Sequence, residues 1–327
     1  MAGRKIEEQL ERISRLIGAP ASDAVPELRK GLGSRIGLVV AKAARVAGDS
    51  GLRELIPEIA AAFERLFEEP VQRDPQCWGK NAAAKALTEL DHRESALFLR
   101  GARHVQMEPV WGGQDDTASS LRGICLLGLA SATDVRRETI LRCVVDGLGD
   151  PKSNVRVDAV RAVAQMGGEE AVLLLRLKAR VGDSELPVVG QVFDCLLALE
   201  REETVEFVAE FLESGKEGVS EEAALALGAS RLTHAIEVLK KAWDVTKDPD
   251  LRLAIARGLS ASRENRAIEF LLGVLKDGRP RDAEAALEAL SIHRETVEIR
   301  EMVERIVGRP AFDRKQRIEA KRQDGRS

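Results

Sequence analysis

The chain has 327 residues, of which 44% are hydrophobic and 32% charged, and only 3% are aromatic, with no tyrosine. Its formal net charge is −4 and its isoelectric point is about 5.8. It therefore lacks the dense positive charge and the aromatic platforms that bind phosphate backbones and stacked bases, and we expect no nucleic-acid partner.

The first 35 residues are expected to form an N-terminal helical cap. Residues 1–16, MAGRKIEEQLERISRL, are charged throughout and lack the apolar core of a signal peptide. An apolar stripe at helical spacing over residues 4–17 and a second helical segment over 23–32 predict an atypical first helix pair. Terminal repeats of a solenoid need a polar outer face, which this pair would supply.

The rest of the chain favours a cytoplasmic protein with no membrane contact. No apolar run approaches the roughly 18 residues that a membrane-spanning helix needs. The four cysteines include no CxxC pair, so we expect reduced thiols that behave as small hydrophobic side chains.

From residue 36 to residue 308 one pattern recurs, in which a small residue is followed directly by an apolar one. Successive occurrences are 43, 42, 34, 33, 31, 32 and 31 residues apart. A further apolar residue lies three positions before each small one, and this spacing places all three on one helix face. The pattern predicts an all-α, right-handed α-solenoid of about eight helix pairs. The small residues are Ala43, Ala86, Gly128, Ala162, Cys195, Ala226, Gly258 and Ala289.

The clearest unit begins at Asp150 and turns at Gly167-Gly168 between its two helices. It resembles the HEAT-like repeats named after phycobilisome lyases, which follow the pattern D-x-x-x-x-V-R-x-x-A-x-x-A. The resemblance implies a helical-repeat architecture and little about activity, because such repeats serve lyase chaperones, scaffolds, adaptors and a few enzymes. The matching residues are Asp150, Val155, Arg156, Ala159 and Ala162.

Two consecutive units are about ten residues longer than the others, and the extra length lies between helix pairs. Both connections begin with the same tripeptide, at residues 69–71 and 108–110. Equivalent connections lie on one edge of a solenoid, so we expect these two to lie side by side. We predict that they present a binding site to a common partner, formed by Arg100, Arg103, His104, Gln106, Trp111, Asp115 and Asp116.

A purely structural interpretation of this segment remains open. The arginine and the histidine at positions 103 and 104 could bond carbonyl groups at a helix end, Trp111 could fill a gap between helices, and the two aspartates could cap the next helix. Two connections that lie far apart, or a buried Trp111 with arginines paired only to carbonyl groups, would favour the structural interpretation.

Catalytic chemistry has less support in the sequence. The four histidines lie in different units and none is followed by glutamate, whereas deoxyhypusine hydroxylase, also built of such repeats, relies on His-Glu pairs for its irons. No G-x-S-x-G, Walker or Rossmann motif is present, so we expect no metal, cofactor or catalytic residue. A small-ligand or enzymatic site within residues 100–116 remains the alternative.

We therefore predict a non-catalytic scaffold or adaptor that holds a protein partner in a concave groove, with the paired connections setting specificity. We expect the second helices of the repeats to line that groove, with arginines in the middle repeats and acidic residues over 200–222. Residues 309–327 carry seven basic and three acidic side chains, and we expect them to form a flexible basic tail.

Removing residues 313–327 should leave the melting temperature within a couple of degrees of the full-length value, because this segment has almost no apolar surface to bury. Thermal denaturation followed by circular dichroism measures this. A large drop would show instead that the segment binds the solenoid, for example on the acidic stretch 200–222.

Overall fold

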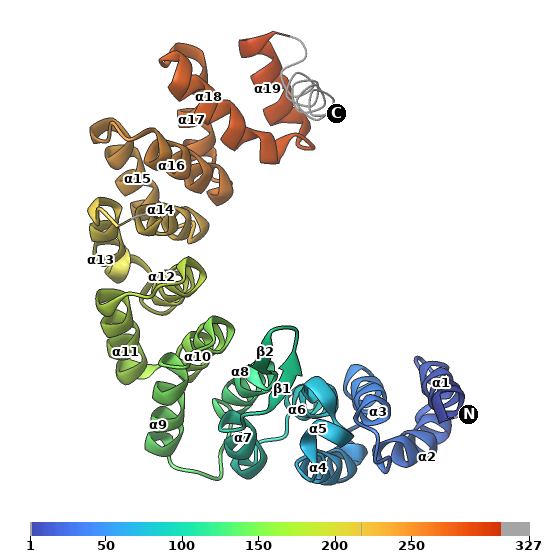
Figure 1. Cartoon of the computed structure of the whole chain (residues 1–327). Helices are drawn as coiled ribbons and strands as arrows, with labels where there is room; N and C mark the ends of the chain where they lie inside the picture. Colours follow the sequence, from blue (N-terminus) through green and yellow to red (C-terminus); the bar gives the residue numbers. More distant parts are fainter. Residues whose placement is uncertain (1, 217, 309–327) are drawn as a thin grey trace. The chain divides into compact units, whose positions relative to one another are not determined.

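The computed structural model describes residues 2–216 and 218–308, so the basic segment 309–327 lies outside the described residues. The described chain is an α-solenoid of HEAT-like helix pairs (Figure 1). It divides into two compact units, Met1–Ala171 and Val172–Ser327. In the part that the structure describes, no helix combines the length and the hydropathy needed to cross a bilayer.

Unit 1 begins with the expected capping pair, α1 (Ala2–Ser14) and α2 (Ala21–Leu32). Three complete pairs follow, and a fourth starts with α10 (Ser153–Met166) and α11 (Gly168–Val181), the helix within which the unit ends. The first helices contact one another in succession. The three complete pairs are α3 (Gly37–Asp49) with α4 (Ile56–Arg65), α6 (Trp78–Glu89) with α7 (Ser95–Ala102), and α8 (Ser119–Leu129) with α9 (Arg137–Leu148).

Unit 2 continues the same alternation, and its first helices again stack in order. Short 3-10 segments lie at Arg201–Thr204, Glu210–Glu213 and Ser291–His293. The pairs are α12 (Leu186–Glu200) with α13 (Val205–Ala209), α14 (Val219–Ala229) with α15 (Thr233–Val245), α16 (Pro249–Ser262) with α17 (Asn265–Asp277), and α18 (Pro280–Leu290) with α19 (Val297–Val307).

The column of small residues is buried within the first helices, and at Gly258 it lies where two of them come close. All eight members are buried, and each lies in a first helix. At Gly258 a Cβ atom would lie 2.4 Å from the Ala224 carbonyl oxygen, and at Gly228 it would lie 2.1 Å from the Gly258 oxygen. Helices α14 and α16 therefore touch backbone to backbone, which no larger residue permits.

Bonds between aspartate and arginine side chains connect the first helices of successive helix pairs. The Asp150 carboxylate accepts a hydrogen bond from the Lys152 amide at 2.8 Å and two from the Arg122 guanidinium at 2.8 and 3.0 Å. Arg252 bonds Asp282 in the same way, at 2.6 and 2.7 Å. Asp150 thus bonds the Lys152 amide just before α10 and holds the arginine of the preceding first helix, whereas Asp282, in the first turn of α18, holds Arg252 only.

Two arginines expected in a basic groove are instead paired with glutamates of the next helix pair. Arg176 bonds Glu200 at 2.7 Å, and Arg180 bonds Glu210 at 2.8 Å. Both guanidinium groups also lie over the Phe207 ring, at 4.5 and 4.6 Å from its centroid. The expected division of the groove into a basic and an acidic stretch is wrong here, because these arginines and glutamates, in neighbouring helix pairs, neutralise each other.

Replacing Gly228 with alanine should lower the free energy of unfolding by about 1–3 kcal/mol, because the new methyl group must push apart two helix backbones. Gly273→Ala is the matched control: this exposed helical glycine has open space around it, so the same change should stabilise the protein by up to about 1 kcal/mol. Urea denaturation measures both. Equal effects of the two substitutions would contradict the backbone contact.

Candidate functional site

The second long connection forms a β-hairpin, not the loop expected from the sequence. Strands β1 (Met107–Val110) and β2 (Gly113–Asp116) pair antiparallel around a Trp111-Gly112 turn, where Gly112 has φ +89°. The Thr117 amide donates to the Gln106 carbonyl at 3.0 Å. Along an antiparallel pair of strands, residue pairs that exchange backbone hydrogen bonds alternate with pairs that do not. Counting from the bonded pair at the base, Pro109 falls in a non-bonded pair, so its lack of an N–H costs no bond to β2.

The first long connection lies against the base of this hairpin. It forms a short helix, α5 (Pro70–Arg73), and a 3-10 turn, η2 (Pro75–Cys77). The Glu108 carboxylate accepts from the Gln76 amide at 2.7 Å, and the Gln106 side-chain amide donates to the Asp74 carbonyl at 3.0 Å. Gln76 and Cys77 both have φ +56°, a conformation that side chains seldom adopt, so Glu108 holds a strained turn in place.

A fully buried ion pair lies under this junction. The Asp74 carboxylate accepts from the amides of Gly79 and Lys80 at 2.6 and 3.0 Å and from the Lys80 ammonium at 2.9 Å. Lys80 also donates to the Leu66 carbonyl at 3.2 Å. Both side chains are completely excluded from solvent, so these bonds replace all of their hydration.

Charged groups also anchor the other side of the hairpin. Asp116 bonds Arg122 at 2.6 Å and accepts from the amides of Gln106 and Ala118 at 3.1 Å. Asp115 bonds Lys152, on the following helix pair, at 2.5 Å. Asp116 thus bonds the Ala118 amide just before α8, but it does not cap the helix as the structural interpretation expected. The hairpin is therefore bonded to three successive helix pairs of unit 1.

The hydrogen bonds of the hairpin base change the acidity of its groups. Burial raises the pKa of Glu108, but bonds from Thr117, Gln106 and Gln76 outweigh it, so the pKa is below its usual value. Burial lowers the pKa of His104 more than its Gln106 bond raises it. Both shifts make the free energy of unfolding fall as the pH falls, because protonation of Glu108 removes a bonded carboxylate and protonation of His104 places a charge in a buried site.

The remaining site residues predicted from the sequence are divided between two places. Arg100 pairs with Glu64 and stacks over Phe67 at 4.2 Å, while His104 meets the edge of the same ring at 4.8 Å. Arg103 is exposed and lies against the thiol of Cys143 on α9. The structure therefore joins Arg100, His104, Gln106 and Asp116 in one connected cluster, and Trp111 lies away from it at the hairpin tip.

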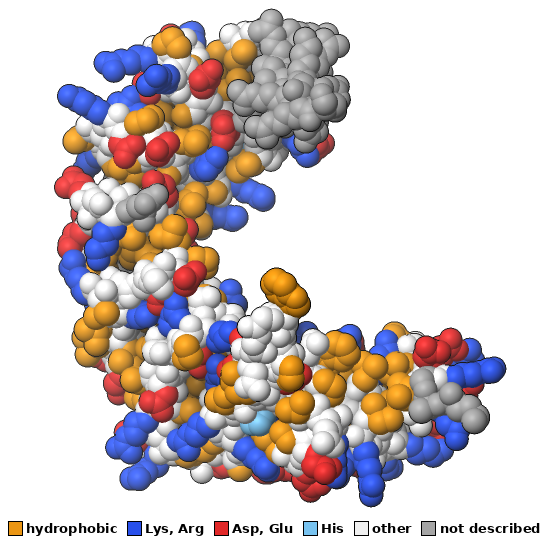
Figure 2. All heavy atoms as spheres, in the orientation of Figure 1, with side chains coloured by type: hydrophobic (Ala, Val, Ile, Leu, Met, Phe, Trp, Pro, Cys, Tyr) orange, Lys and Arg blue, Asp and Glu red, His pale blue; other side chains and the backbone are white. Residues whose placement is uncertain are grey.

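Apolar side chains cover the outer surface of the same region. Trp111 is fully exposed, and Figure 2 shows hydrophobic side chains at the end of the projecting hairpin. The starts of α3 and α6 lie against each other, because a Cβ at Gly79 would lie 2.9 Å from the Gly37 carbonyl, and the hairpin base bonds the segment just before α6. We call the exposed apolar residues around this junction the hairpin patch: Ile36, Leu38, Val71, Trp78, Met107, Val110 and Trp111.

Several residues that build the site were not among the site residues predicted from the sequence, namely Asp74, Lys80, Glu108, Arg122 and Lys152. One feature of the repeat pattern could have identified two of these residues. Lys80 and Arg122 each lie three positions before the leading apolar residue of their unit, where Arg156 lies in the best-defined repeat. A basic residue at that position therefore marks an inward-facing cation, whereas nothing in the local pattern marks Glu108 as buried.

Residues 205–291 match the family model of HEAT repeats. The matched range begins in α13 and ends just after α18, so it lies within unit 2. A comparison with curated proteins gives no match.

Lys80→Met should lower the free energy of unfolding by about 3–5 kcal/mol, because it leaves the Asp74 carboxylate buried without a counter-ion. Lys85→Met removes a lysine from the same helix, where it forms an exposed pair with Glu89 at 3.6 Å, and should cost about 0–1 kcal/mol. Urea denaturation of both variants checks this, and a similar small cost for both would rule out a structural role of the buried pair.

Proposed function

We propose that this protein is a non-catalytic scaffold or adaptor that binds a protein partner through the hairpin patch, with Trp111 as the anchoring side chain. One observation carries the proposal: Trp111 is fully solvent-exposed at the tip of a hairpin whose base is held by buried polar groups. Tryptophan is enriched among the residues that dominate binding energy at protein interfaces.

The rigidity of the base supports this role. An anchor that is already held in one position loses little conformational entropy on binding. The Gln106 side chain bonds the Glu108 carboxylate at 2.6 Å, and Thr117 bonds the same carboxylate at 2.7 Å. Two of the three tryptophans lie in the hairpin patch, whereas the third, Trp243, is buried.

The alternative of an enzyme or small-ligand site has less support in the geometry. The carboxylates of the hairpin base bond protein donors, and the described residues contain no group of three or more histidine, cysteine or acidic side chains placed to hold a metal. Burial raises the pKa of the Cys77 thiol to about 12, so it is protonated at neutral pH and is a poor nucleophile.

We also assign the repeats to the phycobilisome-lyase type of HEAT-like repeat and the protein to the cytoplasm. The bonds between Arg122 and Asp150 support the first assignment, because they join the two charged positions of that repeat pattern. The four buried, unbridged cysteines support a reducing compartment.

Trp111→Ala should weaken partner binding by about 2 kcal/mol, roughly 30-fold in Kd, while the melting temperature stays unchanged, because the side chain touches solvent and not the core. The measurement is quantitative capture of proteins from native lysate by immobilised protein, followed by titration of the captured partner with purified variants.

Leu177→Ala is the control, since Leu177 is a 60% exposed apolar residue of unit 2 that is not part of the hairpin patch. It should leave capture unchanged. Equal capture by wild type and Trp111→Ala would refute the proposed site, as would a strong loss of stability in Trp111→Ala.

A further inference from the structure

Helix α11 carries a row of exposed aliphatic side chains. Leu173, Leu177 and Val181 are 58%, 60% and 72% exposed, and their spacing of four residues places them next to one another along the helix. Figure 2 shows hydrophobic side chains over this helix. Among the described helices, α11 alone exposes three large hydrophobic residues. Single exposed apolar residues are common on protein surfaces, whereas a contiguous row is typical of a contact surface.

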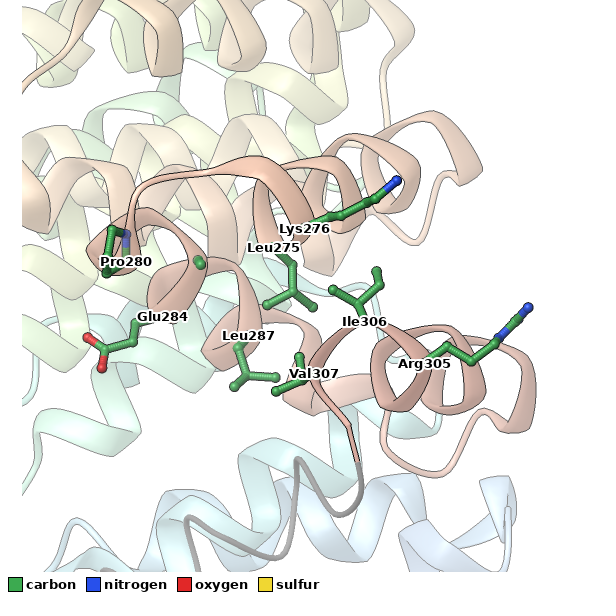
Figure 3. Close-up of a pocket in the computed structure, with 9 residues that line it drawn as sticks. Leu275, Lys276, Pro280, Glu284, Leu287, Arg305, Ile306 and Val307 are labelled. Atoms are coloured by element: carbon green, nitrogen blue, oxygen red, sulfur yellow. The ribbon is translucent and has the colours of Figure 1, made fainter.

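A hollow between α17, α18 and α19 is another apolar feature of unit 2, but it is less uniform. Figure 3 shows four aliphatic side chains that point toward one another across it: Leu275, Leu287, Ile306 and Val307. Charged residues of both signs line it as well, namely Lys276, Glu284 and Arg305. Because a charge needs a counter-charge or water, this hollow does not select an apolar partner in the way that the row on α11 does.

We propose that the row on α11 is the contact surface between two copies of the chain, whose α11 helices pack antiparallel about a two-fold axis. In such a dimer, if residue i of one copy lies opposite residue j of the other, then residue j also lies opposite residue i. With the axis at the level of Leu175, Leu173 of each copy lies opposite Leu177 of the other, because each is two positions from that level. The row thus contacts itself twice, and Val181 extends the contact at both ends.

Charge complementarity favours a second copy as the occupant. Glu169 lies four residues before Leu173, and Arg180 follows Glu169 by eleven residues, about three helical turns, so both project from the same side of the row. In the antiparallel dimer Glu169 of one copy therefore lies beside Arg180 of the other, and this pair forms twice. The arrangement sets the acidic first turn of each α11 against the basic last turn of the other, whereas a parallel pair would place like charges together.

Both charged side chains can reach a second molecule. Glu169 is exposed and has no ion-pair partner within residues 2–216 and 218–308. Arg180 bonds Glu210 at 2.8 Å, but its side chain is 53% exposed, and an exposed pair of this kind rearranges easily because water competes for both groups. The dimer therefore gains two ion pairs without breaking a buried one.

Sedimentation velocity of the full chain at concentrations of about 1–200 µM tests the proposal. A contact of one helix pair is small, so we expect a reversible dimer with a Kd in the micromolar range. Leu177→Ala should raise this Kd roughly tenfold or more, because each dimer loses two buried leucine side chains, and it should leave capture through the hairpin patch unchanged. Val245→Ala is the matched control: it shortens an apolar side chain of α15 that is 76% exposed, and the Kd should not change.

A charge exchange between two variants tests the two-fold register. Glu169→Arg and Arg180→Glu should each, when alone, raise the Kd roughly tenfold or more, because a dimer of identical copies then places like charges beside each other twice. An equimolar mixture of the two variants should form dimers with a Kd within a few-fold of the wild-type value, since every arginine again meets a glutamate. The melting temperature of each variant shows whether it is folded.

A wild-type chain that stays monomeric over this concentration range would contradict the proposal. A dimer that Leu177→Ala leaves intact would place the contact elsewhere, for example at the hairpin patch if Trp111→Ala weakens it. A mixture of the two charge variants that associates no better than either one alone would rule out the antiparallel pairing. The inference is independent of the proposed function, because it concerns a different surface and is measured without any other protein.

Discussion

The hairpin and the first two complete helix pairs depend on one buried carboxylate. Asp74 holds the start of α6 through two backbone amides, binds the Lys80 ammonium and, through its own carbonyl, receives the Gln106 side chain from the hairpin. Three separate parts of unit 1 therefore meet at a single residue. A charge without solvent keeps its partners only in a narrow range of geometries, so this residue also fixes the angle at which the hairpin leaves the helices.

The first strand of the hairpin, with the residues next to it, reverses the usual distribution of polarity. Gln106 and Glu108 are buried, whereas Met107, Val110 and Trp111 are exposed; the second strand keeps polar side chains on the surface. The buried groups satisfy one another, so the reversal costs little hydrogen bonding, but the exposed groups gain nothing from folding alone. Such an arrangement is expected of an element that completes its contacts with another molecule, and this is why we favour binding over a structural role for Trp111.

The repeat architecture could be predicted from the sequence because it follows from spacing. A small residue with two apolar neighbours on one helix face indicates a packed first helix wherever it occurs. The eight first helices and the turn at Gly167-Gly168 are therefore as expected. The hairpin could not be predicted in this way. Its strands are four residues long, β1 contains a proline, and the bonds that hold it join residues more than thirty positions apart, such as Gln76 and Glu108. The extra length of two consecutive connections indicated where in the chain the site lies. The burial of Glu108, in contrast, depends on tertiary contacts alone.

The anchoring of the hairpin to three successive helix pairs has a mechanical consequence. Its bonds to Gln76 on one side and Lys152 on the other cross the planes along which a stack of helices flexes. Apolar contacts tolerate small sliding movements, but a hydrogen bond weakens steeply with distance and angle. The hairpin therefore restricts the sliding of neighbouring helix pairs in this part of an otherwise elastic fold. Any force that bends unit 1 there acts on the hairpin base first, and the orientation of the tip changes with it.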